Sequence, residues 1–428
     1  MSKILILIAG HLCTAPRAQK EAETLAAAGH DVIVRGIWID PKMAEQDREL
    51  VANRRWRFDP VSDLRPLSLT SRSRNLGGRA RRRLAHEVHV RFGKFSPSVL
   101  GYAVRAMVRA GISEAAALTI VHSEAGLWVG CEMLKRRMRV GVDFEDWFSE
   151  DLLPRDRPGR PVERIKSYER ELIRQCDYRV TTSDALARAM AEAYAAPTPD
   201  VIYNVFPFAD RAKMDGAIRD RSGSALPSLH WFSQTIGAGR GLESLFRSLS
   251  LISIPMEVHL RGNCTASARR WLDQLVPGSW QGKVLIHPTV PNSELLSRIA
   301  EHDIGLALEI PELESRNLTV TNKLFQYLQA GLAVIATDTA GQREVFARRP
   351  EIGSLIPADD PRALALAIEE LLKDERKLSG ARAAALKAAE EEFCWEKQQH
   401  KLLTAAEAAL QGQAPKPGSA NLRYATAS

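Results

Sequence analysis

Residues 321–337 read TNKLFQYLQAGLAVIAT, and this stretch decides the fold. Thr321 is suited to the N-cap of a helix that ends at Gly331, because glycine tolerates the positive φ that commonly follows a helix. The apolar run Ala333–Thr337 comes directly afterwards and predicts a buried strand. A helix followed at once by a strand is the repeating unit of a parallel α/β sheet.

The same alternation continues on both sides of this stretch. In the first half, for example, Pro16–Ala28 predicts a helix between two strands, and Gly29 stops it. The strands expected from apolar runs are Ile4–Ala9, Asp31–Ile39, Leu118–His122, Arg139–Asp143, Tyr178–Thr182, Val201–Tyr203, Leu229–Phe232, Met256–Arg261, Val284–Pro288, Ile304–Leu308 and Ala333–Thr337. This pattern predicts an α/β protein with two doubly wound, mostly parallel sheets, in which ligands bind beyond the carboxyl ends of the strands.

The length of 428 residues suits two domains. We expect an N-terminal domain over residues 1–208 and a C-terminal domain over 228–389, joined by a linker at 209–227 where no apolar period is present. Further helices are expected over 390–410. The tail 411–428 is rich in Gly, Pro, Ser and Ala and is expected to be disordered.

The composition, with 45% apolar and 26% charged residues, is that of a soluble globular protein. The opening apolar run Ile4–Gly10 is far shorter than a membrane span and lacks a signal-peptide cleavage site, so we expect a buried strand there. The five cysteines are scattered and include no Cys-x-x-Cys pair. This favours reduced thiols in a cytoplasm over a disulfide framework or a zinc site.

The net charge of +7 is concentrated in the segment Arg72–Lys94, which holds eight basic residues against one acid, Glu87. Such a segment can meet an anionic membrane or an acidic substrate, or can be an ordinary solvated helix face. Nucleic acid is the weaker partner, because no Phe, Tyr or Trp lies between its arginines. We hypothesise that this segment docks peripherally on the inner face of a membrane.

Two stretches of the second half could bind phosphate. Asn322 and Lys323 fall in the first turn of the helix after Thr321, where free N–H groups, the helix dipole and the Lys323 ammonium attract an anion. Gln326 lies one turn on, beside whatever sugar such a phosphate carries. An ordinary amphipathic helix explains the apolar positions equally well, and the two roles are compatible.

The second stretch is the glycine-rich turn SQTIGAGRGLE at 233–243, which follows a strand and opens a helix. Gly237, Gly239 and Gly241 let the backbone approach a ligand, and the guanidinium of Arg240 can bind phosphate oxygens. A tight turn without a ligand explains such a sequence equally well by itself. Combined with Lys323, the turn predicts two cations and two helix starts that converge on a pyrophosphate.

In the first half, polar residues follow several expected strands and are expected to rim a cleft. His122 can exchange a proton near neutral pH and is a candidate contact for a substrate hydroxyl, although a single histidine is more often structural. The other candidates are Gly10, Arg17, Glu124, Asp143 and Glu145. The acids have no matching His or Asp pair nearby in the sequence, so no metal site is expected.

The stretches TNKLFQYLQAGLAVIATDTAGQREV at 321–345 and QTIGAGRGLESL at 234–245 resemble the GT-B fold glycosyltransferases of the GT4-like group (group 1). Weaker similarity at 15–34, 176–190 and 287–308 follows the same order and spacing. The resemblance implies two Rossmann-like domains that face a central cleft. The N-terminal domain is then expected to bind the acceptor, and the C-terminal domain a UDP- or GDP-sugar. The helices over 390–410 are expected to cross back onto the N-terminal domain.

The resemblance also implies residue roles. His122, Arg240 and Lys323 form the expected catalytic set, with the two cations on the diphosphate. The expected donor site comprises Gly10, Thr235, Gly237, Gly239, Arg240, His287, Val290, Asn322, Lys323 and Gln326, and the expected acceptor site comprises Arg17, Glu124, Asp143 and Glu145. Transfer of this hexosyltransferase type is usually retaining and needs no metal or cofactor besides the nucleotide sugar. The implied setting is the synthesis of a cell-surface polysaccharide or glycoconjugate on a glycan or lipid-linked acceptor.

The chain departs from this group at three places. Gln326 stands where the group usually has glutamate, Ala333 where it has proline, and residues 143–146 read Asp-Phe-Glu-Asp in place of Asp-x-His-Glu. Two alternatives stay open. One is a non-catalytic nucleotide-sugar-binding or scaffold protein. The other is an NAD-dependent oxidoreductase, which is less favoured because the glycine-rich turn lacks the G-x-G-x-x-G spacing.

Overall fold

A computed structural model describes residues 1–67, 69–153, 155 and 157–412, so most of the tail expected to be disordered lies outside the described residues. The chain divides into two compact units. Unit 1 comprises Met1–Thr182, Leu186–Ile202 and the chain from Gln399 onward, and unit 2 comprises Ser183–Ala185 and Tyr203–Gln398. Among the described helices, none is long and apolar enough to cross a membrane.

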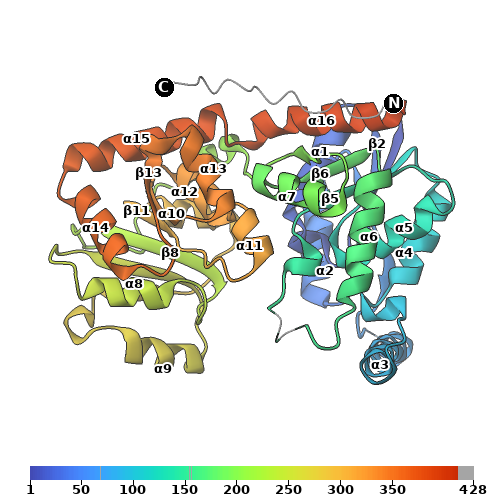
Figure 1. The fold of residues 1–428 in the computed structure, drawn as a ribbon, viewed down its shortest axis with the longest axis horizontal. Helices are drawn as coiled ribbons and strands as arrows, with labels where there is room; N and C mark the ends of the chain where they lie inside the picture. The colour runs from blue at the N-terminus through green and yellow to red at the C-terminus, as the bar shows by residue number, and fades with distance from the viewer. Residues whose placement is uncertain (68, 154, 156, 413–428) are drawn as a thin grey trace. The chain divides into compact units, whose positions relative to one another are not determined.

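Unit 1 is built on a seven-stranded sheet with the order β3-β2-β1-β4-β5-β6-β7, in which neighbouring strands are parallel. The strands are β1 (Lys3–Leu7), β2 (Asp31–Trp38), β3 (Arg57–Asp63), β4 (Leu118–Val121), β5 (Val140–Phe144), β6 (Tyr178–Thr181) and β7 (Asp200–Val201). The helices coloured blue to green in Figure 1 are α1 (Pro16–Ala27), α2 (Pro41–Val51), α3 (Leu69–Phe92), α4 (Val104–Glu114), α5 (Ser123–Leu134), α6 (Val162–Gln175) and α7 (Asp184–Tyr194). The later residues of α16 (Trp395–Gln411) also belong to unit 1. Strands β4 and β5 are buried at every residue, as expected for the centre of a parallel sheet.

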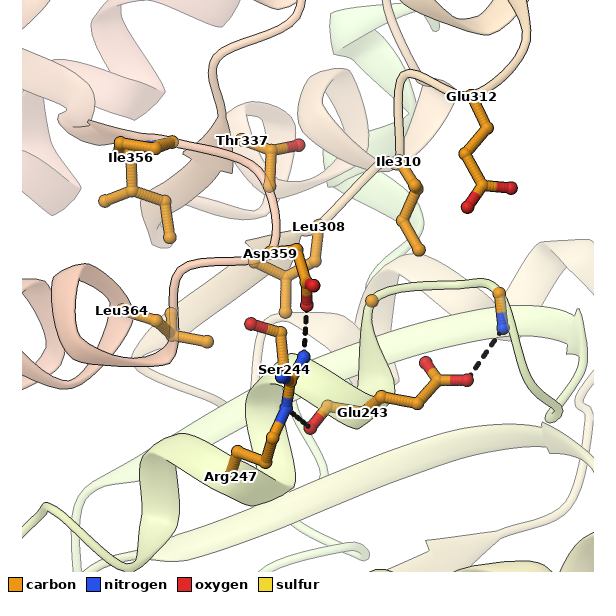
Figure 2. Close-up of a pocket in the computed structure, with 13 residues that line it drawn as sticks. Glu243, Ser244, Arg247, Leu308, Ile310, Glu312, Thr337, Ile356, Asp359 and Leu364 are labelled. Carbon is orange, nitrogen blue, oxygen red and sulfur yellow. Dashed lines mark hydrogen bonds and ion pairs between the residues drawn. The ribbon is translucent and has the colours of Figure 1, made fainter.

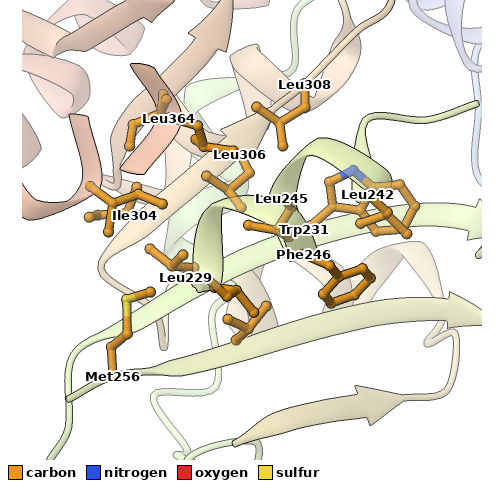
Figure 3. Packing of buried hydrophobic residues seen from close by; sticks show 14 of the residues in the cluster. Leu229, Trp231, Leu242, Leu245, Phe246, Met256, Ile304, Leu306, Leu308 and Leu364 are labelled. Carbon is orange, nitrogen blue, oxygen red and sulfur yellow. The ribbon is translucent and has the colours of Figure 1, made fainter. Parts of the chain in front are cut away.

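Unit 2 is built on a six-stranded parallel sheet with the order β10-β9-β8-β11-β12-β13. The strands are β8 (Ser228–Thr235), β9 (Glu257–Asn263), β10 (Val284–His287), β11 (Ile304–Ala307), β12 (Ala333–Thr337) and β13 (Gly353–Ile356). The helices are α8 (Leu242–Leu249), α9 (Ala266–Leu275), α10 (Asn292–Ile299), α11 (Glu314–Leu318), α12 (Asn322–Ala330), α13 (Ala340–Arg348), α14 (Pro361–Leu372) and α15 (Glu375–Glu391). Its core packs Trp231 and Leu306 of the sheet against Leu242 and Phe246 of α8 and Leu364 of α14 (Figure 3).

Two α/β units, each built on a parallel sheet, confirm the expected doubly wound fold class. The segment 209–227, which we predicted as a linker, is grouped with unit 2. It begins within a short 3-10 helix (Phe208–Lys213) and is then tied down by charge, since Asp215 binds Arg298 at 2.5 Å and Asp220 pairs with Arg261. Because these contacts are polar, the segment shows no apolar periodicity in the sequence.

Candidate functional site

The start of helix α12 carries the first predicted cation, Lys323. Its Nζ lies 2.5 Å from Oε1 of Glu309, which follows β11, and 5.8 Å from the ring centroid of Trp231 on β8. Burial by itself would raise the pKa of Glu309, but Lys323 holds that pKa below its ordinary value. Glu309 is therefore an ionised counter-ion of Lys323. When another anion binds Lys323, the ammonium must either contact both anions or leave Glu309.

The first turn of α12 is open at its backbone. Thr321 lies at the N-cap with extended geometry, as expected, but its side chain accepts no cap hydrogen bond from the turn. Asn322 is exposed and Gln326 is half-buried. Because the first N–H groups of a helix have no intrahelical partner, this turn can donate to an anion beside Lys323.

The glycines of the turn between β8 and α8 serve different purposes. A Cβ at Gly241 would lie 2.3 Å from the carbonyl oxygen of Leu308, and its φ is +80°, so close packing requires glycine there. Gly239 has a φ of +71°, and its N–H donates to Oε1 of Glu243 at 2.9 Å. A Cβ at Gly237 would meet no atom within 4 Å. Of these three glycines, Gly237 is thus the one whose identity neither close packing nor a positive φ requires, and it leaves open space for a ligand.

The second predicted cation, Arg240, lies exposed on this turn. Its Nη1 donates to Oγ of Ser233 at 3.0 Å. Ser233 lies two residues beyond Trp231, the ring that Lys323 approaches, and Thr235 ends the same strand exposed to solvent. Arg240 and Lys323 therefore contact residues two positions apart on β8, each from the start of a different helix.

A cavity of about 350 Å³ opens beside the glycine-rich turn. Figure 2 shows that Asp359 faces Arg247 of α8 across it, and these two side chains form an ion pair. Glu243 and Glu312 also line it, whereas Gly239 is the one predicted donor residue among its lining residues. Carboxylates repel a diphosphate but accept hydrogen bonds from hydroxyls, so the cavity suits a neutral, hydroxyl-rich group.

The segment His287–Val290, which holds two residues of the expected donor site, begins in a row of four histidine rings, three of them buried. His287 stacks on His259 with ring centroids 5.2 Å apart, His259 lies 4.6 Å from His302, and His302 stacks on His230 at 4.5 Å. Burial lowers the pKa of all four rings, that of His259 to about 4. The rings are therefore neutral near pH 7.

One carboxylate from the segment 209–227 joins this row. Asp220 places Oδ1 3.4 Å from Nδ1 of His287 and Oδ2 3.7 Å from Nε2 of His302. Arg261 pairs with Asp220 and also donates to the carbonyl oxygen of Pro288 at 2.6 Å. The position of the segment after β10 is therefore fixed by buried polar contacts.

In unit 1, His122 is held between two carboxylates. Its Nε2 lies 2.8 Å from Glu21 and its Nδ1 2.8 Å from Glu145, while the hydroxyl of Tyr178 donates to Glu21 at 2.9 Å. Burial would lower the pKa of His122, but the two carboxylates raise it well above its ordinary value. The ring is thus an imidazolium with both nitrogens engaged, and not the free donor or acceptor that we expected. Glu145, whose side chain is 34% exposed, is the member that reaches solvent.

Arg17 and Asp143, predicted to contact an acceptor, are both buried and bind each other. Nε of Arg17 lies 2.5 Å from Oδ2 of Asp143, and Nη1 donates to the carbonyl oxygen of Ile202 at 2.8 Å. Burial raises the pKa of Asp143 to about 7, against the opposing effect of Arg17. In this structure the two side chains are internal supports of unit 1, out of reach of a substrate.

The remaining predicted residues of unit 1 have ordinary surroundings. Glu124 pairs with Arg160 at 2.5 Å, and the carbonyl oxygen of Gly10 accepts from the N–H of Ile37 at 2.9 Å. Ligand atoms of Glu21, His122 and Asp143 lie within 4.8 Å of one another, as do those of His11, Cys13 and Asp47. In both groups each side chain already takes part in an ion pair or hydrogen bond within the protein.

Sequence reasoning missed several residues of these networks. Glu21 and Tyr178 meet His122 only through the sheet topology, so no local spacing reveals them. The histidine row had a readable signal, because three successive strands of the second half carry His230, His259 and His287.

Comparisons with known proteins agree with this architecture. Residues 242–404 match the family model described as "Glycosyl transferase-like", which covers less than half of the chain. No curated protein matches the chain. The resemblance to GT-B glycosyltransferases is confirmed, whereas the narrower GT4-like assignment stays a prediction.

Solved structures share the fold at low identity. A sucrose-phosphate synthase from Thermosynechococcus elongatus has a TM-score of 0.69 at 15% identity, covering 96% of this chain and 100% of that one. A glycosyltransferase from Rickettsia africae has a TM-score of 0.68 at 13% identity, covering 96% and 99%. HepE of Anabaena in complex with UDP has a TM-score of 0.66 at 14% identity, covering 95% and 100%. These likenesses establish the fold and leave the reaction to be argued from the site.

Proposed function

We propose that this chain is a glycosyltransferase that moves a sugar from a UDP- or GDP-sugar to a glycan or lipid-linked acceptor. The observation that carries the proposal is a pair of cations at two helix starts: Lys323 lies near the ring of Trp231 on β8, and Arg240 bonds Ser233 on the same strand. A diphosphate is the ligand that such a site favours. The family match over 242–404 and the UDP complex of Anabaena HepE support this choice.

In the proposed reaction, the bond between the anomeric carbon and the diphosphate breaks, and the diphosphate oxygen keeps the electron pair. The acceptor oxygen bonds to the anomeric carbon on the same face, and its proton passes to the departing phosphate, so the configuration is retained. Lys323, Arg240 and the first turn of α12 stabilise the charge on the leaving diphosphate, which makes a metal unnecessary. Gln326 contacts the ribose, and His287–Val290 contacts the base.

The acceptor belongs to unit 1 in this proposal. The imidazolium of His122 is a fixed positive charge, and Glu145 carries the network to the surface. We place the protein in the cytoplasm, peripheral to the inner face of a membrane, in the synthesis of a cell-surface polysaccharide or glycoconjugate.

A transfer assay tests the proposal. The protein is incubated with UDP- and GDP-sugars and membrane or glycan acceptors, and released nucleotide and product mass are followed. Donor turnover that is lost in the Lys323→Ala/Glu309→Gln double variant and kept in Glu309→Gln supports transfer. Nucleotide-sugar binding without any turnover favours the non-catalytic alternative, and stabilisation by NAD alone favours an oxidoreductase.

A further inference from the structure

Helix α3 is packed on one side and open on the other. On the packed side of the helix, Ala85 is buried, Asn75 donates to the carbonyl oxygen of Leu64 at 2.6 Å, and Gly159 lies close to His86. Figure 1 shows α3 at the margin of unit 1. The remaining face of a 24-residue helix is therefore available to a partner.

The exposed face combines apolar side chains with arginines. Leu76 is 66% exposed and Leu84 is 65% exposed. They lie two helical turns apart on one row, with the exposed Ala80 between them. Arg79 and Arg83 form the adjacent row. Large apolar side chains that stay exposed beside basic ones are the pattern of a helix that lies in a membrane interface.

A hollow of about 320 Å³ opens beside the arginine row, between α3 and the segment near Tyr102. It is lined by Arg79, Arg82, Arg83, His86, Val99 and Tyr102. The guanidinium of Arg82 lies 4.9 Å from the ring centroid of Tyr102. Within the described part of the chain, no ion pair engages Arg79 or Arg83. These two guanidinium groups are thus available to an anionic group in the hollow.

We propose that α3 docks on a bilayer rich in anionic phospholipid, with a headgroup phosphate in this hollow and Leu76 and Leu84 inserted at the acyl boundary. The basic charge of the helix complements the surface, and the arginine fork suits a phosphate. The leucines add a contact that salt does not screen. The inference rests on the membrane location given in the proposed function and specifies the surface that provides it, whereas loss of vesicle binding would leave sugar transfer in solution untouched.

Vesicle flotation of the full chain tests the proposal, with phosphatidylglycerol-rich and pure phosphatidylcholine vesicles at low and high salt. Binding to the anionic vesicles alone is expected. Arg79→Gln/Arg83→Gln is expected to weaken this binding about 30-fold, which corresponds to roughly 5-fold for each arginine. The matched control, Arg81→Gln/Arg91→Gln, removes the same charge from the same helix outside the hollow and is expected to lose several-fold less.

Leu76→Ser/Leu84→Ser tests insertion and is expected to abolish the part of the binding that survives high salt. All of these side chains are exposed, so unchanged melting curves serve as the folding control. Equal losses in the two arginine pairs overturn the hollow as a headgroup site. Absence of vesicle binding, capture of RNA instead, or full displacement by free glycerol phosphate overturns membrane docking.

Discussion

The pairing of Lys323 with Glu309 makes a sharp prediction about the donor site. In Lys323→Ala, Glu309 loses its counter-ion at a site where the two side chains are only 15% and 20% exposed. Removing one partner of a buried pair costs about 3–5 kcal/mol, and partial exposure reduces this to about 2–3 kcal/mol of unfolding free energy. In Lys323→Ala alone, weaker nucleotide binding could therefore not be separated from lower stability of the fold.

Glu309→Gln resolves the confusion. The double variant Lys323→Ala/Glu309→Gln should regain stability to within about 1 kcal/mol of the wild type, because no unpaired charge is left. It should still bind UDP or GDP about 10- to 150-fold more weakly, since a charge-assisted hydrogen bond is worth about 1.5–3 kcal/mol. Glu309→Gln alone should bind the diphosphate more tightly than the wild type, because Lys323 is released from its internal partner.

Isothermal titration calorimetry with UDP and GDP, together with thermal melts of the four proteins, measures both quantities. If the double variant binds as tightly as Glu309→Gln, then Lys323 does not contact the diphosphate. The reasoning about the pair also fails if Lys323→Ala melts like the wild type.

Three further sets of variants probe the histidine row, the glycine-rich turn and the His122 network. Below the ordinary histidine pKa of about 6.5, the unfolded chain takes up protons that the buried row cannot, so the stability of the fold should decrease as the pH drops from 6.5 towards 4. Over that range, His259 accounts for a loss on the order of 3 kcal/mol of unfolding free energy. In thermal melts at pH 7.5 and 5, His259→Asn should therefore show a smaller pH effect than the wild type. Gly241→Ala should destabilise unit 2 by more than about 2 kcal/mol in urea unfolding. Gly237→Ala should leave the stability within about 0.5 kcal/mol of the wild type and weaken nucleotide binding. Equal stability losses in the two variants contradict the different roles given to these glycines. Glu21→Gln should cost about 3 kcal/mol at pH 7 by unpairing buried His122, and the half-exposed Glu145→Gln clearly less, as compared by urea unfolding.

The sequence predicted the architecture because parallel strands are continuous apolar runs. β12, at Ala333–Thr337, has the predicted bounds, and β8 extends the predicted strand at both ends. The edge strand β3, at Arg57–Asp63, was missed because it is polar, contains Pro60 and is buried at none of its residues. An edge strand lacks the apolar signal that marks a central one.

The candidate site was predictable only in part. The phosphate-binding character of Lys323 and Arg240 could be predicted from their places at helix starts, since that chemistry is local. Their partners Glu309 and Ser233 were not predicted. Glu309 lies 14 residues before Lys323, and the loop and helix α11 between β11 and α12 decide whether the two side chains meet. Ser233 lies seven residues before Arg240, and the backbone of the glycine-rich turn decides where the guanidinium lies. His122 shows the same limit: its residue type suggested a titrating contact, and its long-range carboxylate partners make it a buried imidazolium.

The central claim is that a diphosphate lies between the turn before α8 and the start of α12. A crystal of the chain grown with UDP or GDP tests it most directly. The account predicts phosphate oxygens within hydrogen-bond distance of Lys323 Nζ and the Arg240 guanidinium, with Glu309 no longer the sole partner of Lys323. A nucleotide bound at another place in unit 2, with the Lys323–Glu309 pair intact, contradicts it.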